Sequence, residues 1–248
     1  MSVAIEVQHL AKTYVRRVRA NRDISFQIRT GESVGVLGPN GSGKTTLLRQ
    51  LYGELRSDSG TVRILDHVVP NEITGIKNRL GVMPQDARPR TDLTVFSHLY
   101  YAMLLRGFDR GRARTLTENA IDELDLKENR GTYIADLSGG TQRKVLLALS
   151  LAHSPEVLLL DEPTVGLDIL FRNRIWQTLK ASLAEGRRTL LITSHYPQDI
   201  ETLCTRIICL KEGTILYDGA ISGLIARTGT GSLEQAYLSL MEGRDYGN

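Results

Sequence analysis

The chain has 248 residues, of which 41% are apolar and 24% are charged, so a buried core of ordinary size is expected. The formal net charge of +3 is too small to indicate a nucleic-acid partner, and none is expected. The first residues lack the basic start and apolar run of an export signal, and no apolar run approaches the roughly 18 residues of a membrane-spanning helix. These features predict a cytoplasmic protein, with Cys204 and Cys209 as buried free thiols.

Short apolar runs alternate with helical patterns along the chain, which predicts an α/β fold with a mostly parallel sheet. The first runs are not all separated by helices, and this N-terminal part is expected to form an antiparallel β subdomain. A helix is predicted over 45–52, after a strand and a glycine-rich segment. Strands are predicted over 3–7, 24–28, 33–37, 61–65, 80–83, 156–160, 189–193, 206–210 and 214–217.

Residues 86–155 show no strand pattern and are predicted to form a helical insert. The apolar spacing predicts helices over 95–106, 111–124 and 140–152, with Thr94 and Asp109 as N-terminal caps. We expect one domain over 1–225, followed by a short tail, 226–248. The tail contains a glycine-rich break at 228–232 and a helix over 233–241, with four residues on one face: Leu233, Ala236, Tyr237 and Leu240.

The segment GPNGSGKTT, at 38–46, contains the pattern G-x-x-x-x-G-K-[ST] between a predicted strand and a predicted helix. Its glycines let backbone N–H groups turn inward toward phosphates, and the helix N-terminus adds partial positive charge. Lys44 is predicted to reach the β- and γ-phosphates of ATP, and the Thr45 hydroxyl to bind Mg²⁺. The predicted nucleotide contacts are Gly38, Pro39, Asn40, Gly41, Ser42, Gly43, Lys44, Thr45 and Thr46.

The segment VLLLDEP, at 157–163, is predicted to be a buried strand that delivers two carboxylates to its carboxyl end. Ligands of open α/β sheets bind at that edge. Asp161 is expected on the Mg²⁺ side, and Glu162 is placed to polarise the attacking water. Alone, the segment could be a strand that ends in two solvated acids, but the phosphate loop favours the functional interpretation.

The segment LSGGTQRK, at 137–144, places Ser138, Gly139 and Gly140 just before a predicted helix. Such a start is a second anion-friendly helix N-terminus. One nucleotide site has no need of two, so from composition alone a structural bend is an equally good interpretation.

Together the three segments resemble the nucleotide-binding domain of ABC transporters, from Val3 to about Ile225, in that family's order and spacing. The resemblance implies that Tyr14 stacks on adenine, and that Gln85 contacts Mg²⁺ and the water and links the site to the insert. It also implies that Asp168 belongs to the D-loop, that His195 lies near the γ-phosphate, and that residues 138–140 close over the ATP of a second subunit. Without the resemblance, Tyr14, Gln85 and His195 could be structural.

The implied catalytic residues are therefore Lys44, Gln85, Glu162 and His195, and the implied Mg²⁺ ligands are Thr45, Gln85 and Asp161. Two departures from the family pattern are small. The segment LSGG continues as Thr141-Gln142-Arg143-Lys144, which is a less usual continuation in that family. The run Arg16, Arg17, Arg19 is unusually basic. That run could be a solvated face or a contact for nucleotide or acidic lipid. The remaining histidines are expected to be structural: His9, His67, His98 and His153.

The resemblance implies an ATPase that dimerises, with itself or with a paralogue, around two MgATP molecules. It would drive a membrane subunit on a separate chain from the inner face of the membrane. The compact tail and the lack of a long C-terminal regulatory domain favour export over import. The alternatives are a soluble ABC ATPase in Fe–S assembly, translation or DNA repair, or a P-loop GTPase or kinase. No N-K-x-D motif supports a GTPase, and neither GTPases nor kinases explain LSGG.

Overall fold

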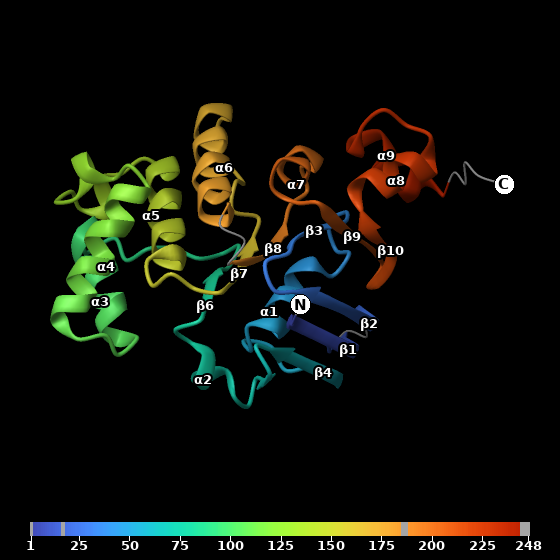
Figure 1. The fold of residues 1–248 in the computed structure, drawn as a ribbon, viewed down its shortest axis with the longest axis horizontal. Coiled ribbons are helices and arrows are strands. Elements are labelled where there is room, and N and C mark those ends of the chain that lie inside the picture. The colour runs from blue at the N-terminus through green and yellow to red at the C-terminus, as the bar shows by residue number, and fades with distance from the viewer. Residues whose placement is uncertain (1, 16–17, 185–187, 244–248) are drawn as a thin grey trace.

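The computed structural model describes residues 2–15, 18–184 and 188–243, which form two β-sheets flanked by helices (Figure 1). Arg16 and Arg17 of the basic run lie outside the described residues, and Arg19 begins the second strand. The larger sheet has six strands in the order β10-β9-β3-β8-β7-β6. Its strands are β3 (Ser33–Leu37), β6 (Leu80–Met83), β7 (Val157–Asp161), β8 (Thr189–Thr193), β9 (Arg206–Lys211) and β10 (Thr214–Ala220).

The larger sheet is parallel except for β10, which pairs antiparallel with β9. Strands β7 and β8 are buried along their whole length, as near-continuous apolar runs require when helices or a second sheet cover both faces. Strands β3, β8, β7 and β6 lie side by side in that order. The loops that follow these four strands therefore meet at one edge of the sheet, and all four contain predicted site residues.

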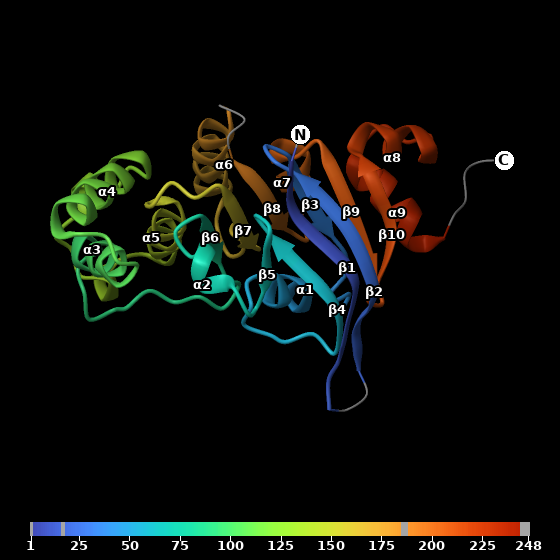
Figure 2. The same cartoon turned by 60° about the horizontal axis from the view of Figure 1, so that its bottom comes forward.

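The smaller sheet confirms the predicted antiparallel N-terminal portion. Its order is β2-β1-β4-β5, and every pair is antiparallel. Figure 2 shows these strands in front of the larger sheet, and one apolar cluster joins both sheets to α1 through Leu47, Leu48 and Leu51. The strands are β1 (Val3–Thr13), β2 (Arg19–Arg29), β4 (Ser59–Ile64) and β5 (His67–Val69), and α1 is Lys44–Leu51.

The helical insert lies at one end of the molecule (Figure 1), and the caps expected for two of its helices are confirmed. Thr94 accepts a hydrogen bond from the Ser97 N–H, and Asp109 accepts one from the Arg112 N–H. The insert packs on the larger sheet through a second apolar cluster, opposite the smaller sheet. Its elements are α3 (Val95–Leu105), α4 (Arg110–Glu123), η1 (Lys127–Asn129), η2 (Ile134–Asp136) and α5 (Gly139–Leu151), and α2 (Ile73–Ile76) precedes it.

The remaining helices are α6 (Ile169–Leu183), α7 (Pro197–Leu203), α8 (Ile221–Thr228) and α9 (Leu233–Glu242). Helix α9 confirms the predicted tail helix, since Leu233 and Ala236 are buried and Tyr237 and Leu240 pack against the same cluster. The predicted domain boundary at residue 225 falls inside α8. Both cysteines are buried free thiols, as expected. No helix in the described ranges has the length and apolar character needed to span a bilayer.

Candidate active site

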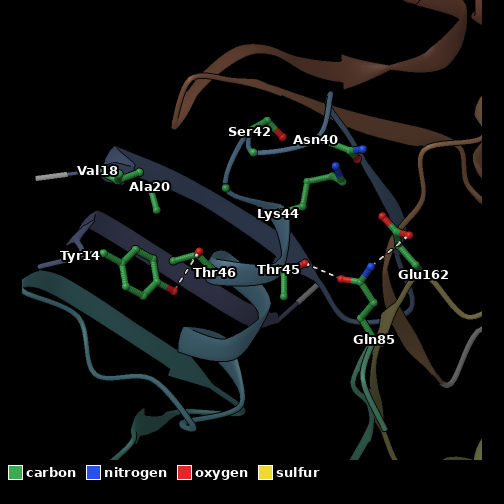
Figure 3. Close-up of a pocket in the computed structure, with 12 residues that line it drawn as sticks. Tyr14, Val18, Ala20, Asn40, Ser42, Lys44, Thr45, Thr46, Gln85 and Glu162 are labelled. Atoms are coloured by element: carbon green, nitrogen blue, oxygen red, sulfur yellow. Dashed lines mark hydrogen bonds between the residues drawn. The ribbon is translucent and has the colours of Figure 1, made fainter. Parts of the chain in front are cut away.

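The phosphate loop connects β3 to α1 and lines a pocket at the carboxyl edge of the larger sheet (Figure 3). Its shape depends on glycine at two positions. Gly43 has a φ of 105°, and a Cβ there would lie 2.2 Å from the Ala20 carbonyl oxygen, while a Cβ on Gly38 would lie 2.4 Å from Ser42 Oγ. The lining residues are Tyr14, Val18, Ala20, Asn40, Gly41, Ser42, Gly43, Lys44, Thr45, Thr46, Gln85 and Glu162.

Lys44 begins α1 and is 5% exposed. Its Nζ donates to the Gly38 and Pro39 carbonyl oxygens at 2.7 and 3.2 Å. Burial lowers the pKa of Lys44, and the nearby carboxylates of Glu162 and Asp161 act in the opposite direction. The ammonium group is thus held at the rim of the loop, facing both acids.

Three oxygen-bearing side chains gather beside Lys44. The Thr45 hydroxyl donates to Gln85 Oε1 at 3.1 Å, and Asp161 Oδ1 accepts from Thr193 Oγ1 at 2.5 Å. Asp161 Oδ2 is buried and has no hydrogen-bond partner among the described residues. Burial raises the pKa of Asp161, while the hydroxyl groups of Thr193 and Thr45 act in the opposite direction.

These donors fit a magnesium ion, since Mg²⁺ prefers hard oxygen ligands and takes one or two carboxylates together with phosphate oxygens and water. The orphaned Asp161 Oδ2 would gain a cation in place of a lost water. Within the described residues there is no cluster of three or more His, Cys, Asp or Glu side chains that could hold a metal by itself. A metal here would therefore depend on the nucleotide for part of its ligand set.

Glu162 follows β7 in an unusual backbone conformation, with a φ of 48°. Its N–H donates to Thr193, to Oγ1 at 3.0 Å and to the carbonyl oxygen at 3.2 Å. Its Oε2 lies 3.1 Å from His195 Nδ1 and 3.5 Å from Gln85 Nε2, and Figure 3 shows the Gln85 amide between Thr45 and Glu162. Side chains from the loops after β6, β7 and β8 thus meet at one carboxylate oxygen.

Other predicted residues lie in different surroundings. Ser138 caps α5 by accepting from the Thr141 N–H at 3.2 Å, and neither it nor the two glycines line the pocket. Asp168 caps α6, with Oδ1 accepting from the N–H groups of Leu170 and Phe171. Tyr14 lines the pocket at its far end, and its hydroxyl lies 3.2 Å from Thr46 Oγ1.

Sequence reasoning missed several supports of the site, among them Thr193 and Asp199. Thr193 bonds both Asp161 and Glu162, although the sequence shows it only as the last residue of a strand. Asp199 on α7 is fully buried and accepts from Thr164 Oγ1, Ser194 Oγ and Arg172 Nη2 at 2.5, 2.8 and 2.8 Å. This carboxylate ties the start of α6 to the loop that carries His195, and nothing in the sequence pattern marks it.

Comparisons with known proteins agree with this geometry. A family model described as "ABC transporter" matches residues 21–165. The Nod factor export ATP-binding protein I of Paraburkholderia xenovorans is 36% identical over 223 residues, which are 90% of this chain and 73% of that protein. The linearmycin resistance ATP-binding protein of Bacillus subtilis is 32% identical over 235 residues, 95% of this chain and 75% of that protein.

A solved structure also matches. A dimeric ATP-binding cassette bound to ADP and phosphate gives a TM-score of 0.80 at 25% identity, covering 87% of this chain and 98% of that chain. The family match spans more than half of the chain and includes the phosphate loop, the LSGG turn and the two acids at the end of β7. The chain therefore belongs to the ABC transporter family, as one of its ATP-binding subunits that hydrolyse ATP.

Proposed function

We propose that this chain is the motor of an export transporter, in which two ATP-binding subunits enclose two MgATP molecules and drive a membrane subunit on another chain. The observation that carries the proposal is the convergence on Glu162. Its carboxylate is reached by His195 and Gln85, and Gln85 in turn bonds Thr45 of the phosphate loop. Binding and hydrolysis groups thus form one connected set within a chain.

The residues divide the work by position. Backbone N–H groups of 38–46 and the Lys44 ammonium hold the phosphates, and Tyr14 stacks on the adenine. Thr45, Gln85 and Asp161 would hold Mg²⁺, which when bound neutralises charge on the phosphate oxygens. Glu162 accepts a proton from the attacking water, and His195 contacts the γ-phosphate and orients the acid, which its contact with Glu162 Oε2 supports.

The LSGG turn is assigned to the partner's nucleotide. In a head-to-tail dimer, Ser138, Gly139 and Gly140 of one chain face the phosphates held by Lys44 of the other, near Asp168. The γ-phosphate would then contact both subunits, so its loss removes binding energy from the closed dimer alone. Such differential binding is what lets a nucleotide drive a conformational change. The pair is formed by two copies of this chain or by this chain and a paralogue.

Export is supported by the relatives, since the similar proteins from Paraburkholderia and Bacillus are named for Nod factor export and linearmycin resistance. The membrane subunit is expected to dock on 93–106, at the inner face of the membrane. Leu105 and Tyr101 on α3 support this, since both are large apolar side chains and are 85% and 49% exposed. Recovery of a polytopic membrane protein with this chain from detergent extract is expected, whereas a soluble scaffold as sole partner would contradict transport.

The decisive test of the site is Glu162→Gln. The variant keeps the phosphate loop, so it is expected to bind MgATP normally and to form a stable dimer detected by light scattering. Its kcat should fall by roughly 10²–10⁴-fold, the usual contribution of a general base. A matched control is Glu156→Gln. Glu156 precedes the first residue of β7, at the edge of the sheet opposite Glu162, and its exposed side chain pairs with Arg79. Normal turnover by Glu162→Gln would reject the assigned base.

A further inference from the structure

Arg143 extends from the helical insert to the catalytic edge of the sheet. It lies on α5, five residues after Ser138, and its guanidinium group donates to backbone carbonyls outside the insert helices. Nε donates to the Pro163 oxygen at 3.0 Å, Nη2 to the Glu162 oxygen at 2.6 Å and the Asp161 oxygen at 3.5 Å. Nη1 donates to the Gln85 oxygen at 3.3 Å.

The four acceptors belong to two segments, the end of β7 with the loop after it and the loop after β6. Only a planar guanidinium presents several donors in a fixed fork, and so one arginine can bind both loops at once. Burial lowers the pKa of Arg143, and Asp161 and Glu162 oppose that effect. The side chain is therefore a partly buried polar bridge whose guanidinium donates to neutral backbone carbonyls.

The bridge meets Glu162 at its strained point. A φ of 48° is unfavourable for a residue with a side chain, so it persists where the surroundings hold it. The Glu162 N–H is held by Thr193 from the sheet, and its carbonyl is held by Arg143 from the insert. The two bonds hold the backbone on either side of the Glu162 side chain, whose carboxylate contacts His195 and Gln85.

We infer that Arg143 is a positioning residue that makes the Glu162 turn and the Gln85 loop follow the position of α5. The inference rests on the proposed function, because it gives the same helix two tasks. The N-terminus of α5 closes on the partner's ATP through Ser138, and Arg143, little more than one turn later, sets the acid in the chain's own site. One rigid helix thus links the two ATP sites of the dimer.

The test compares Arg143→Gln with Arg143→Lys in ATP hydrolysis, with the membrane partner present if turnover requires it. Misplacing the acid is expected to lower the kcat of Arg143→Gln by about 10²-fold, as small errors of position do. The KM for ATP should stay within about threefold, since the phosphate loop is intact. Arg143→Lys keeps one donor group, so its kcat should be about a tenth of the parent's or higher.

A matched control is Arg130→Gln. Arg130 is also an insert arginine, but its guanidinium bonds Glu118 and lies over the Phe96 ring, all within the insert. This variant should stay within about twofold of the parent in kcat. A kcat of Arg143→Gln within twofold of the parent would overturn the inference. So would a loss of ATP binding as large as the loss of kcat, or a lysine variant no better than the glutamine variant, since each indicates a structural bridge.

Mixed dimers test whether Arg143 acts on its own chain. In a dimer of Arg143→Gln with Lys44→Ala, the only loaded site uses the Glu162 turn that lacks its arginine, and it should be slow. When both changes are on one chain and the partner is the parent, the loaded site keeps its own Arg143 and should turn over normally. The reverse order would contradict the inference. If Glu162→Gln itself hydrolyses ATP normally, the proposed function fails as well; if it is inactive while Arg143→Gln is normal, this inference alone fails.

Discussion

The sheet side and the insert side of the predicted ATP site are built differently. On the sheet side, Thr45, Gln85, Glu162 and His195 are already linked by hydrogen bonds within one chain, and Lys44 is buried beside them. On the insert side, Ser138 bonds to Thr141 of its own turn, and a Cβ on Gly139 would meet no atom within 4 Å in the described part of the chain.

The difference shows which half is complete by itself. On the sheet side, hydrogen bonds within one chain hold the predicted binding and hydrolysis groups together, and such preorganisation is what lowers a barrier. The insert side has a helix N-terminus that faces open space, where it can receive an anion but has none within its own chain. A second subunit would supply that anion, and Arg143 is the bridge from this turn back to the sheet side.

Removing the main cation from the sheet side should give the largest effect on ATP binding. Lys44→Ala is expected to lower kcat/KM for ATP by about 10²–10³-fold, because one preorganised charged donor on the phosphates is lost. ATP binding by the isolated chain should weaken too. Lys12→Ala is the control, since Lys12 bonds Asp58 and does not line the pocket. Equal ATP affinity in Lys44→Ala and the parent would break the assignment of this half.

A change on the insert side should separate hydrolysis from binding. Gly139→Asp has room for its side chain, and an acid is compatible with a helix N-terminus. The isolated chain should therefore bind ATP normally, while hydrolysis falls by about 10²-fold because a carboxylate faces the partner's phosphates. Gly139→Asn, similar in size but uncharged, should lose less. Weakened ATP binding by the isolated Gly139→Asp chain would contradict the division into halves.

The stability of the contact between the insert and the larger sheet should depend on pH. His153 follows α5, is buried, and its Nε2 donates to the Leu80 oxygen of β6 at 3.1 Å. Burial lowers the pKa of His153 to about 4. The folded pKa of His153 lies below the unfolded value near 6.5, so protonation is less favourable in the folded protein. The unfolding free energy therefore has its full value above pH 6.5 and decreases as the pH falls toward 4.

At pH 5 this loss amounts to about 2 kcal/mol of unfolding free energy relative to pH 8. Urea unfolding of the parent and of His153→Gln at both pH values measures it, because other titrating groups are shared. The glutamine variant should lose less stability on acidification. The same pH dependence in both proteins would show that His153 is not buried as a neutral ring.

The smallest effect is expected at the adenine end of the pocket. Tyr14→Ala should raise the KM for ATP about fivefold with kcat unchanged, since stacking of a base on an aromatic ring contributes about 1 kcal/mol or more. Tyr14→Phe keeps the ring and should stay near the parent. A changed kcat, or no change in KM for the alanine variant, would remove Tyr14 from the adenine contact.

Much of the sheet was predictable because its strands are buried and uniform. The bounds of β3, β6 and β8 match the predicted ones, since each is a short apolar run between polar or glycine residues. Strands β1 and β2 extend well beyond their predictions, because their distal halves pair with each other through register shifts and lack a regular alternation of buried and exposed residues. The sequence pattern does not predict helix α6, because its first residues, Ile169 and Leu170, are apolar but exposed and do not lie on a buried face.

The site was predictable where local pattern determines geometry and unpredictable where distant segments meet. The phosphate loop is one continuous segment, so the positions of its glycines and of Lys44 predict its conformation directly. Arg143, Thr193 and Asp199 bond to residues that are distant in the sequence. The separations run from 18 positions, for Arg143 and Asp161, to 58 positions, for Arg143 and Gln85. The bond of Asp199 to Ser194 is the exception among these contacts. The carbonyl or carboxylate that such a side chain contacts depends on the packed fold. The periodicity of apolar residues in the sequence does not predict it.

Mixing two inactive variants tests the central claim, that each ATP is held by Lys44 of one chain and by the Ser138 turn of the other. Lys44→Ala chains keep an intact turn, and Gly139→Asp chains keep an intact phosphate loop. Equal amounts that pair at random form mixed dimers with one complete site, so about a quarter of the parent's ATPase rate should return. A mixture no more active than its two components would show that the two halves do not meet across a dimer.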